Sequence, residues 1–162
     1  GPIFILNPNP LLGQAGGRGL RATGYATEIQ LPALALESPE PQFIPVTPDG
    51  IEPELELASG RVVNRVTGWR FQSEFIWSNL TLAQVTQIVQ ICSWRAKGGS
   101  VETRPRADGV GRFRVIPSAP VIAHPEGLYV THAARFSVIG VDILTDIPVY
   151  TSESPQYYEL EF

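Results

Sequence analysis

The sequence feature that most constrains the fold is the stretch from Thr81 to Lys97, TLAQVTQIVQICSWRAK. Thr81 followed three residues later by Gln84 matches a capping box, in which each side chain bonds the other residue's backbone N–H at the start of a helix. Apolar residues then recur at three- and four-residue steps, and the glycine pair after Lys97 can end the helix in a left-handed conformation. We therefore predict a helix at residues 81–97 whose apolar stripe packs on a β core; the stripe comprises Leu82, Val85, Ile88, Val89 and Cys92, widened by Ile91 and Trp94.

Substitutions on the two sides of this helix are expected to have different effects. Gln84, Gln87 and Gln90 fall opposite the apolar stripe. We therefore expect Val89→Asp to unfold the domain or stop its assembly, whereas Gln87→Asp should have little effect. Cys92 is the single cysteine, which excludes an intrachain disulfide, and its place on the stripe predicts a small buried hydrophobe rather than a reactive thiol.

Segments with strand patterns surround the helix. Residues 54–58 alternate between acidic and apolar side chains, and a Ser-Gly turn leads into residues 61–66, which predicts a hairpin. Residues 69–77 alternate with aromatic side chains on one face, which indicates a core strand. Further strands are expected at residues 100–104 and 112–116, which form a second hairpin, and at 128–130 and 134–144. The predicted fold class is mainly β with one helix (α+β): a sandwich or barrel of antiparallel strands flanked by a single α-helix, with an extended N-terminal arm and a long loop.

The prolines and glycines, fifteen of each, divide the chain into regions. Residues 1–2 resemble the scar left by a tag-cleaving protease, and we expect the native chain to start near Ile3. Residues 3–50 read as an arm and loop rich in Pro and Gly, with short strands near 3–6 and 25–31. The five glycines from Gly13 to Gly24 do not have the spacing of a phosphate-binding loop. We therefore expect the β-rich core domain to comprise residues 51–162.

Charge and hydropathy exclude several classes of partner. Sixteen acidic against twelve basic residues give a net charge of −4, which offers no basic face for specific nucleic-acid binding. No long apolar run is present, so membrane insertion is not expected. No serine or cysteine lies in a strand-turn-helix elbow that would expose a nucleophile. We expect no catalytic residues, no cofactor and no metal, and hence no enzyme.

His124 and His132 are the only histidines. The turn-forming residues 125–127 between them could bring them together as a metal site, because histidines flanking a hairpin can converge on one ion. The two histidines are eight residues apart in loop and strand segments, which is not the tight spacing of metal ligands. We therefore favour ordinary loop and strand histidines over a metal site.

Candidate interface residues lie in three places. The hairpin at 100–116 gathers four arginines that either cover an exposed strand face or contact acidic neighbouring subunits. The glycine-rich arm carries two more, and the C-terminal tail carries adjacent tyrosines in a segment that could pair with a sheet edge. The candidates are Arg18, Arg21, Arg104, Arg106, Arg112, Arg114, Tyr157 and Tyr158.

The order of elements resembles a known family. The carrying segments are residues 54–77, the helix TLAQVTQIVQICSW at 81–94, and VETRPRAD at 101–108 followed by Phe113-Arg-Val. Over residues 54–145 they resemble the tail-tube and distal-tail proteins of tailed phages, in which a β-sandwich or barrel carries one flanking helix. The segment pattern also resembles uncharacterised tail and baseplate proteins of phages and prophages.

The resemblance implies a structural virion component, made in the host cytoplasm and placed in the tail. It implies a homo-oligomeric ring, hexameric, that joins sheets between subunits and contacts neighbouring tail proteins through its arms and loops. Tube, terminator, distal-tail and baseplate roles all stay open. The alternative from another class is a β-sandwich carbohydrate-binding or adhesin module, which requires an exposed sugar-stacking ring at Trp69, Trp77 or Trp94.

Overall fold

The computed structural model describes residues 1–9, 25–47, 54–56, 62–64, 66–106, 111–124 and 131–148. Over these residues the class is mainly antiparallel β with one α-helix, as predicted. The elements in chain order are β1 (Ile3–Asn7), β2 (Thr27–Gln30), β3 (Gln42–Val46), β4 (Glu54–Glu56), β5 (Val62–Asn64), β6 (Gly68–Leu80), α2 (Leu82–Ser93), the 3₁₀ turn η1 (Arg95–Lys97), β7 (Ser100–Arg104), β8 (Phe113–Pro117), β9 (Val121–Ala123) and β10 (His132–Leu144).

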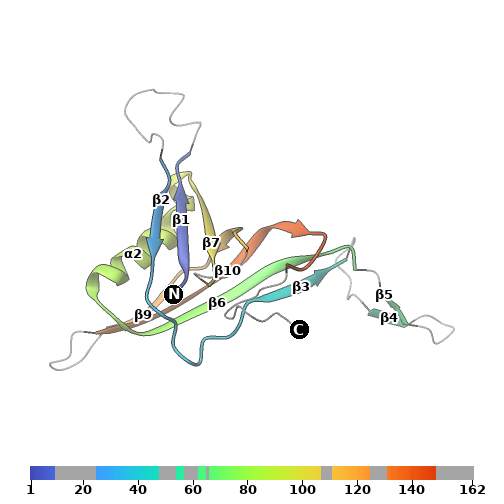
Figure 1. The fold of residues 1–162 in the computed structure, drawn as a ribbon, viewed down its shortest axis with the longest axis horizontal. Helices are drawn as coiled ribbons and strands as arrows, with labels where there is room; N and C mark the ends of the chain where they lie inside the picture. The colour runs from blue at the N-terminus through green and yellow to red at the C-terminus, as the bar shows by residue number, and fades with distance from the viewer. Residues whose placement is uncertain are drawn as a thin grey trace, which may run out of the picture.

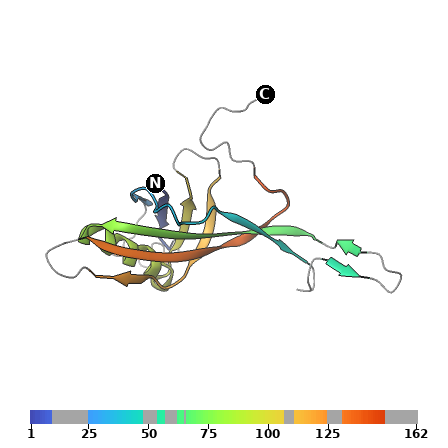
Figure 2. The same ribbon diagram turned by 90° about the horizontal axis from the view of Figure 1, so that it is seen from below.

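Eight strands form one open sheet in the order β2-β1-β7-β8-β10-β6-β3, with β9 paired to β10. The long strands β6 and β10, each 13 residues, run side by side along the molecule (Figures 1 and 2). The predicted hairpins are confirmed, since β7 pairs with β8 and β4 pairs with β5. The β4–β5 ribbon is separate from the main sheet and lies beyond one end of the long strands (Figure 1). The strand expected at 128–130 falls outside the described residues.

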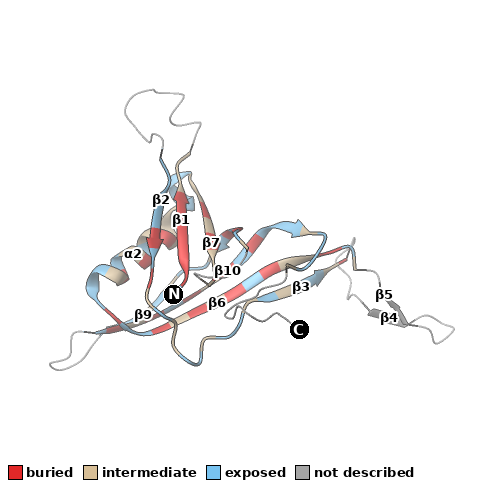
Figure 3. Cartoon of the chain, viewed as in Figure 1, coloured by how far each residue is buried: buried red, intermediate tan, exposed pale blue. Residues whose placement is uncertain are grey.

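The sheet curls so that its two halves enclose an aromatic core. Phe4 on β1 lies 5.2 Å from Phe75 on β6 and 5.5 Å from Phe136 on β10, measured between ring centroids. A second cluster forms where Phe71 stacks on Phe113 with centroids 4.2 Å apart. The predicted aromatic face of β6 is thereby confirmed as core, and burial is concentrated on β1 and the middle of β6 (Figure 3).

The N-terminal strands correct the expectation of an arm. β1 is buried on both faces, and Phe4 and Leu6 are fully buried. The backbone N–H of Leu31 donates to the carbonyl of Pro2, 3.0 Å away, so a residue set aside as a scar extends the contact between β1 and the segment after β2. The short strands expected near 3–6 and 25–31 are confirmed as β1 and β2. The expectation that the first strand belongs to an arm outside the core is wrong, because a continuous apolar run such as IFIL suits a strand that is covered on both sides.

The helix begins as predicted. The backbone N–H of Gln84 donates to Thr81 Oγ1 at 3.2 Å, and the Thr81 N–H donates to Gln84 Oε1 at 2.9 Å, which confirms the capping box. The α-helix ends at Ser93, four residues earlier than Lys97, and a 3₁₀ turn follows. Gly98 then takes the left-handed conformation, with φ of 95°.

The buried face of α2 differs from the predicted stripe. Val85, Ile88 and Ile91 are buried, whereas Leu82 is 63% and Val89 44% exposed. With about 100° of rotation per residue, Val89 lies about 100° and Leu82 about 120° from a face centred on Ile88. The expectation that Val89 faces the core is therefore wrong.

The end of the helix is tied to β1. Trp94 Nε1 donates to the carbonyl of Asn7 at 2.8 Å. A Cβ atom at Gly99 would overlap both partners of this hydrogen bond, so the second glycine after the helix is needed for close approach.

Candidate functional site

The outward face of the sheet carries a band of half-exposed aliphatic side chains. Ile116 on β8 is directly opposite Ile139 on β10, and Ile143 on β10 and Ile44 on β3 are both opposite Arg70 on β6. Residues opposite each other across antiparallel strands share one face of the sheet. We call the outer aliphatic band Ile44, Ile116, Ile139, Val141 and Ile143, whose exposed fractions run from 37% to 44%.

Polar groups lie within this band and beside it, and Arg70 separates Ile44 from Ile143 in the register. The guanidinium of Arg70 donates through Nη1 to the carbonyl of Gly140 at 2.9 Å and so lies across β10. At the other side Arg114 Nη2 lies 3.3 Å from Asp142 Oδ1. Several exposed apolar side chains gathered on one face beside polar groups are typical of a protein interaction site.

The arginines of the 100–116 hairpin all lie in the described structure, and three of them pair within the chain. Arg112 Nε lies 3.2 Å from Glu102 Oε1, Arg114 pairs with Asp142, and Arg106 pairs with Glu40. Arg104 lies opposite Ile3 in the β1–β7 register and is half-buried. These contacts favour the interpretation of an exposed strand face whose charges are balanced locally. The other candidates, Arg18, Arg21, Tyr157 and Tyr158, lie outside the described residues.

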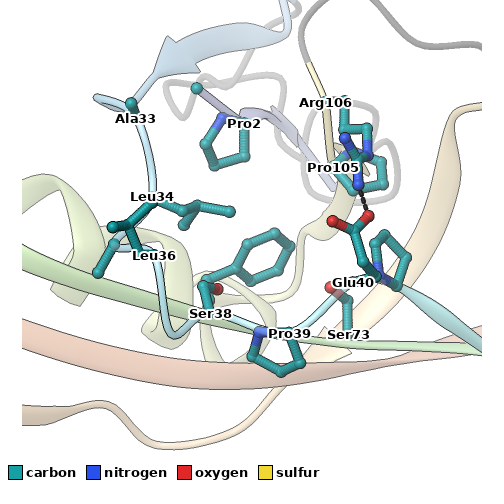
Figure 4. Close-up of a pocket in the computed structure, with 14 residues that line it drawn as sticks. Pro2, Ala33, Leu34, Leu36, Ser38, Pro39, Glu40, Ser73, Pro105 and Arg106 are labelled. Carbon is teal, nitrogen blue, oxygen red and sulfur yellow. Dashed lines mark ion pairs between the residues drawn. The ribbon is translucent and has the colours of Figure 1, made fainter. Parts of the chain in front are cut away.

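A cavity of about 670 Å³ opens beside β1. Its walls come from the start of the chain, the segment 33–41 and the two residues after β7, and Phe75 of β6 lies among its apolar lining. Figure 4 shows Leu34 and Pro2 on one side and the Arg106–Glu40 ion pair on the other. Sequence reasoning missed this cavity because its walls come from segments far apart in the chain. Its lining combines apolar side chains with Ser38, Ser73 and one ion pair.

The segment that forms one wall of this cavity is held along the edge of β6. Ala35 donates its backbone N–H to the carbonyl of Ile76 at 2.8 Å. The Ser38 hydroxyl donates to the carbonyl of Glu74 at 3.0 Å and accepts the N–H of Ile76 at 3.2 Å. The backbone of β6 is therefore partnered beyond the end of β3, and the edges of the described sheet belong to β2, β3 and the short strand β9.

The three tryptophans, all within the described residues, are buried or half-buried. Trp77 is 1% exposed, and its Nε1 donates to the carbonyl of Pro32 at 2.9 Å. Trp69 and Trp94 are half-buried. Because a sugar-stacking platform needs an open aromatic face, the carbohydrate-binding alternative gains no support from these positions.

The two histidines lie together. His124 Nδ1 and His132 Nδ1 are 3.3 Å apart, and the imidazole planes are nearly perpendicular at 87°. Ala123 and Ala133 pair across β9 and β10, which makes the histidines the next opposed pair toward the connecting segment. The two residues are a strand and a loop histidine, as favoured, and they also converge, which the turn-forming composition of residues 125–127 indicated.

Cys92 packs against the core cluster and is half-buried. Burial disfavours the thiolate and raises the pKa of the Cys92 thiol to about 12. The predicted role as a small hydrophobe fits this environment.

Alkylation of Cys92 by iodoacetamide at pH 8 is expected to be on the order of a thousand-fold slower in the folded protein than in urea, because only the thiolate reacts. Mass spectrometry of timed samples measures both rates on the single thiol. Equal rates in the two conditions would contradict the buried, protonated state.

Comparisons of the chain with models of known protein families and with curated protein sequences give no match. Within the described residues, no helix is long and apolar enough to cross a membrane. The outer aliphatic band and the open sheet edges are therefore the observations on which a functional proposal rests.

Proposed function

We propose that the protein is a structural component of a phage or phage-like tail, as a tail-tube, distal-tail or baseplate subunit. It assembles into homo-oligomeric rings, hexameric by the family resemblance, and contacts neighbouring tail proteins in the virion. Its role is mechanical and involves no catalytic turnover. The observation that carries the proposal is the outer aliphatic band on an open sheet.

The band supports assembly because five Ile and Val side chains on one face stay partly exposed to water after folding. Association removes this remaining apolar surface from water. Burying a fully exposed Ile or Val contributes about 1.5–3 kcal/mol, so the remaining exposed part of each side chain is worth on the order of 1 kcal/mol. Several such side chains together can offset the loss of free rotation and translation on association, which a single exposed isoleucine cannot.

The sheet edges support the second kind of contact in the proposal. β2 and β3 end the order of strands in the main sheet. An edge strand presents unpaired N–H and C=O groups, and pairing with the edge of a neighbouring subunit satisfies them. A closed ring is a symmetric way to satisfy such an edge repeatedly without forming an open fibre.

The test replaces Ile139 and Ile143 of the band with lysine. The double variant is expected to fold normally and to self-associate at least about a hundred-fold more weakly, because about 3 kcal/mol of apolar contact is lost at each interface. Light scattering measures the oligomeric state, and negative-stain images show whether rings or tubes form. The control carries the same added charge at Tyr25 and Leu36, which are 91% and 102% exposed and lie outside the band.

Monomer at every concentration, with neither rings nor tubes in the wild-type images, would contradict self-assembly. Equal loss of assembly in the control would show that added charge, rather than the band, is responsible.

A further inference from the structure

We propose that His124 and His132 form a binding site for a divalent transition-metal ion of the zinc type. The site lies where β9 and β10 approach the segment that joins them. This inference does not rest on the proposed function, because it concerns a different face of the chain and needs no assembly.

The separation of the two imidazoles matches that of two ligands on one ion. In tetrahedral zinc sites Zn–N distances are about 2.0–2.1 Å, which places two nitrogen ligands about 3.3 Å apart. His124 Nδ1 and His132 Nδ1 are 3.3 Å apart, whereas the ring centroids are 5.3 Å apart. The Nδ1 atoms lie closer together than the centroids, so each ring turns this nitrogen toward the other.

The backbone fixes this arrangement. His132 is opposite Leu80 of β6, and Leu80 is fully buried. His132 is itself 8% exposed, whereas His124, directly after β9, is exposed. One ligand is therefore anchored against the sheet, and the other leaves the site open for an ion to enter from solvent.

The contact between the two Nδ1 atoms is one that a bound ion can replace. Two facing Nδ1 atoms can form a hydrogen bond only if one carries a proton and the other accepts it. A bound ion accepts both Nδ1 lone pairs, and the proton of the hydrogen bond moves to Nε2 of the same ring by tautomerisation, so that each Nε2 then carries one hydrogen. Imidazole pairs favour borderline ions such as Zn²⁺, Ni²⁺ and Cu²⁺ over Mg²⁺ and Ca²⁺, which prefer oxygen ligands.

The described residues supply two ligands, since no group of three or more His, Cys, Asp and Glu side chains suited to a metal occurs among them. Water, or a donor from a second molecule, fills the other positions. Few other side chains in the sequence compete with this pair for a zinc ion. The sequence contains two histidines and one cysteine, and burial of Cys92 raises its thiol pKa to about 12, which keeps the thiolate ligand scarce.

Isothermal titration of the full chain with ZnCl₂ in a non-chelating buffer tests the proposal. We expect saturable binding of one ion per chain, or one ion per two chains, with a dissociation constant in the micromolar range, on the order of −8 kcal/mol. His124→Gln is expected to weaken binding at least tenfold while leaving the fold intact, because His124 is exposed. His132→Gln is the second variant, and circular dichroism verifies that it is folded before its affinity is compared.

Asp146→Asn is the matched control, because it removes an exposed ligand-type side chain outside the pair and should leave zinc affinity unchanged. MgCl₂ is expected to give no saturable heat. Absence of zinc binding up to about 1 mM, which corresponds to about −4 kcal/mol, would overturn the proposal. Equal zinc affinity in the wild type and His124→Gln would also overturn it, and either result leaves the test of ring assembly unaffected.

Discussion

The substitution Ile88→Asp is expected to abolish the folded state, whereas Val89→Asp one residue later leaves the protein folded. Ile88 is fully buried at the centre of the helix face that covers the sheet, and Val89 is 44% exposed. An aspartate at 88 loses the apolar contacts of isoleucine and leaves a charge without a partner in the core, which together exceed about 5 kcal/mol. That is comparable with the whole stability of a domain of this size.

At Val89 the aspartate retains contact with water, so the loss of stability is expected to be about 1 kcal/mol or less. Urea unfolding followed by circular dichroism measures both variants, and the adjacent positions make each the control for the other. A cooperative unfolding transition in Ile88→Asp with a midpoint near that of wild type would contradict the placement of α2.

Phe4→Ala is expected to lower the free energy of unfolding by about 3–5 kcal/mol, the range for removing a buried aromatic side chain. Phe4 is fully buried and its ring contacts Phe75 and Phe136, so truncation removes an edge-to-face contact and leaves a cavity between the two halves of the sheet. An arm residue outside the core would show almost no change.

The matched control is Leu36→Ala, at a fully exposed apolar position, where a change within about 0.5 kcal/mol is expected. Chemical denaturation with tryptophan fluorescence measures both, since Trp77 reports on the same cluster. Similar small effects in the two variants would show that β1 does not stabilise the core.

The two predictions differ in what they test. Ile88→Asp examines the face of the helix that meets the sheet, and Phe4→Ala examines whether the first strand closes the core from the opposite side. If both hold, the core depends on contacts between residues almost the full length of the described chain apart, such as Phe4 with Phe136. Such long-range contacts form late and cost loop-closure entropy, so folding slower than in helical proteins of this size follows.

Much of the local structure was accessible from sequence patterns. Thr81 and Gln84 predict the capping box because its partners lie three residues apart and need nothing else from the fold. The alternation at residues 69–77 predicts a strand with one aromatic face, and the structure buries Phe71, Phe75 and Trp77 on that face. The hairpin predicted at 100–116 has its paired strands where the pattern places them.

Less of the candidate site could be predicted from the sequence. The outer aliphatic band joins residues of β3, β8 and β10, and no short-range pattern places Ile44 and Ile143 on either side of Arg70. The predicted arginines were correctly placed on the hairpin, yet their carboxylate partners, such as Asp142 for Arg114, come from other segments. The histidines were identified as a possible pair, but their Nδ1 contact depends on the register of β9 with β10.

The sequence by itself determined the elements that short-range physics controls: the start of the helix at Thr81, the left-handed turn at Gly98, and the two-residue period of β6. Only the tertiary structure decided that the helix centres on Ile88 rather than Val89, and that the strand Ile3–Asn7 is the middle of the core rather than part of an arm. The physical reason is that caps and periods are satisfied by neighbours in the chain. Which of several apolar residues is buried depends instead on the distant surfaces that meet it, here β1, β6 and β10 closing on one aromatic cluster.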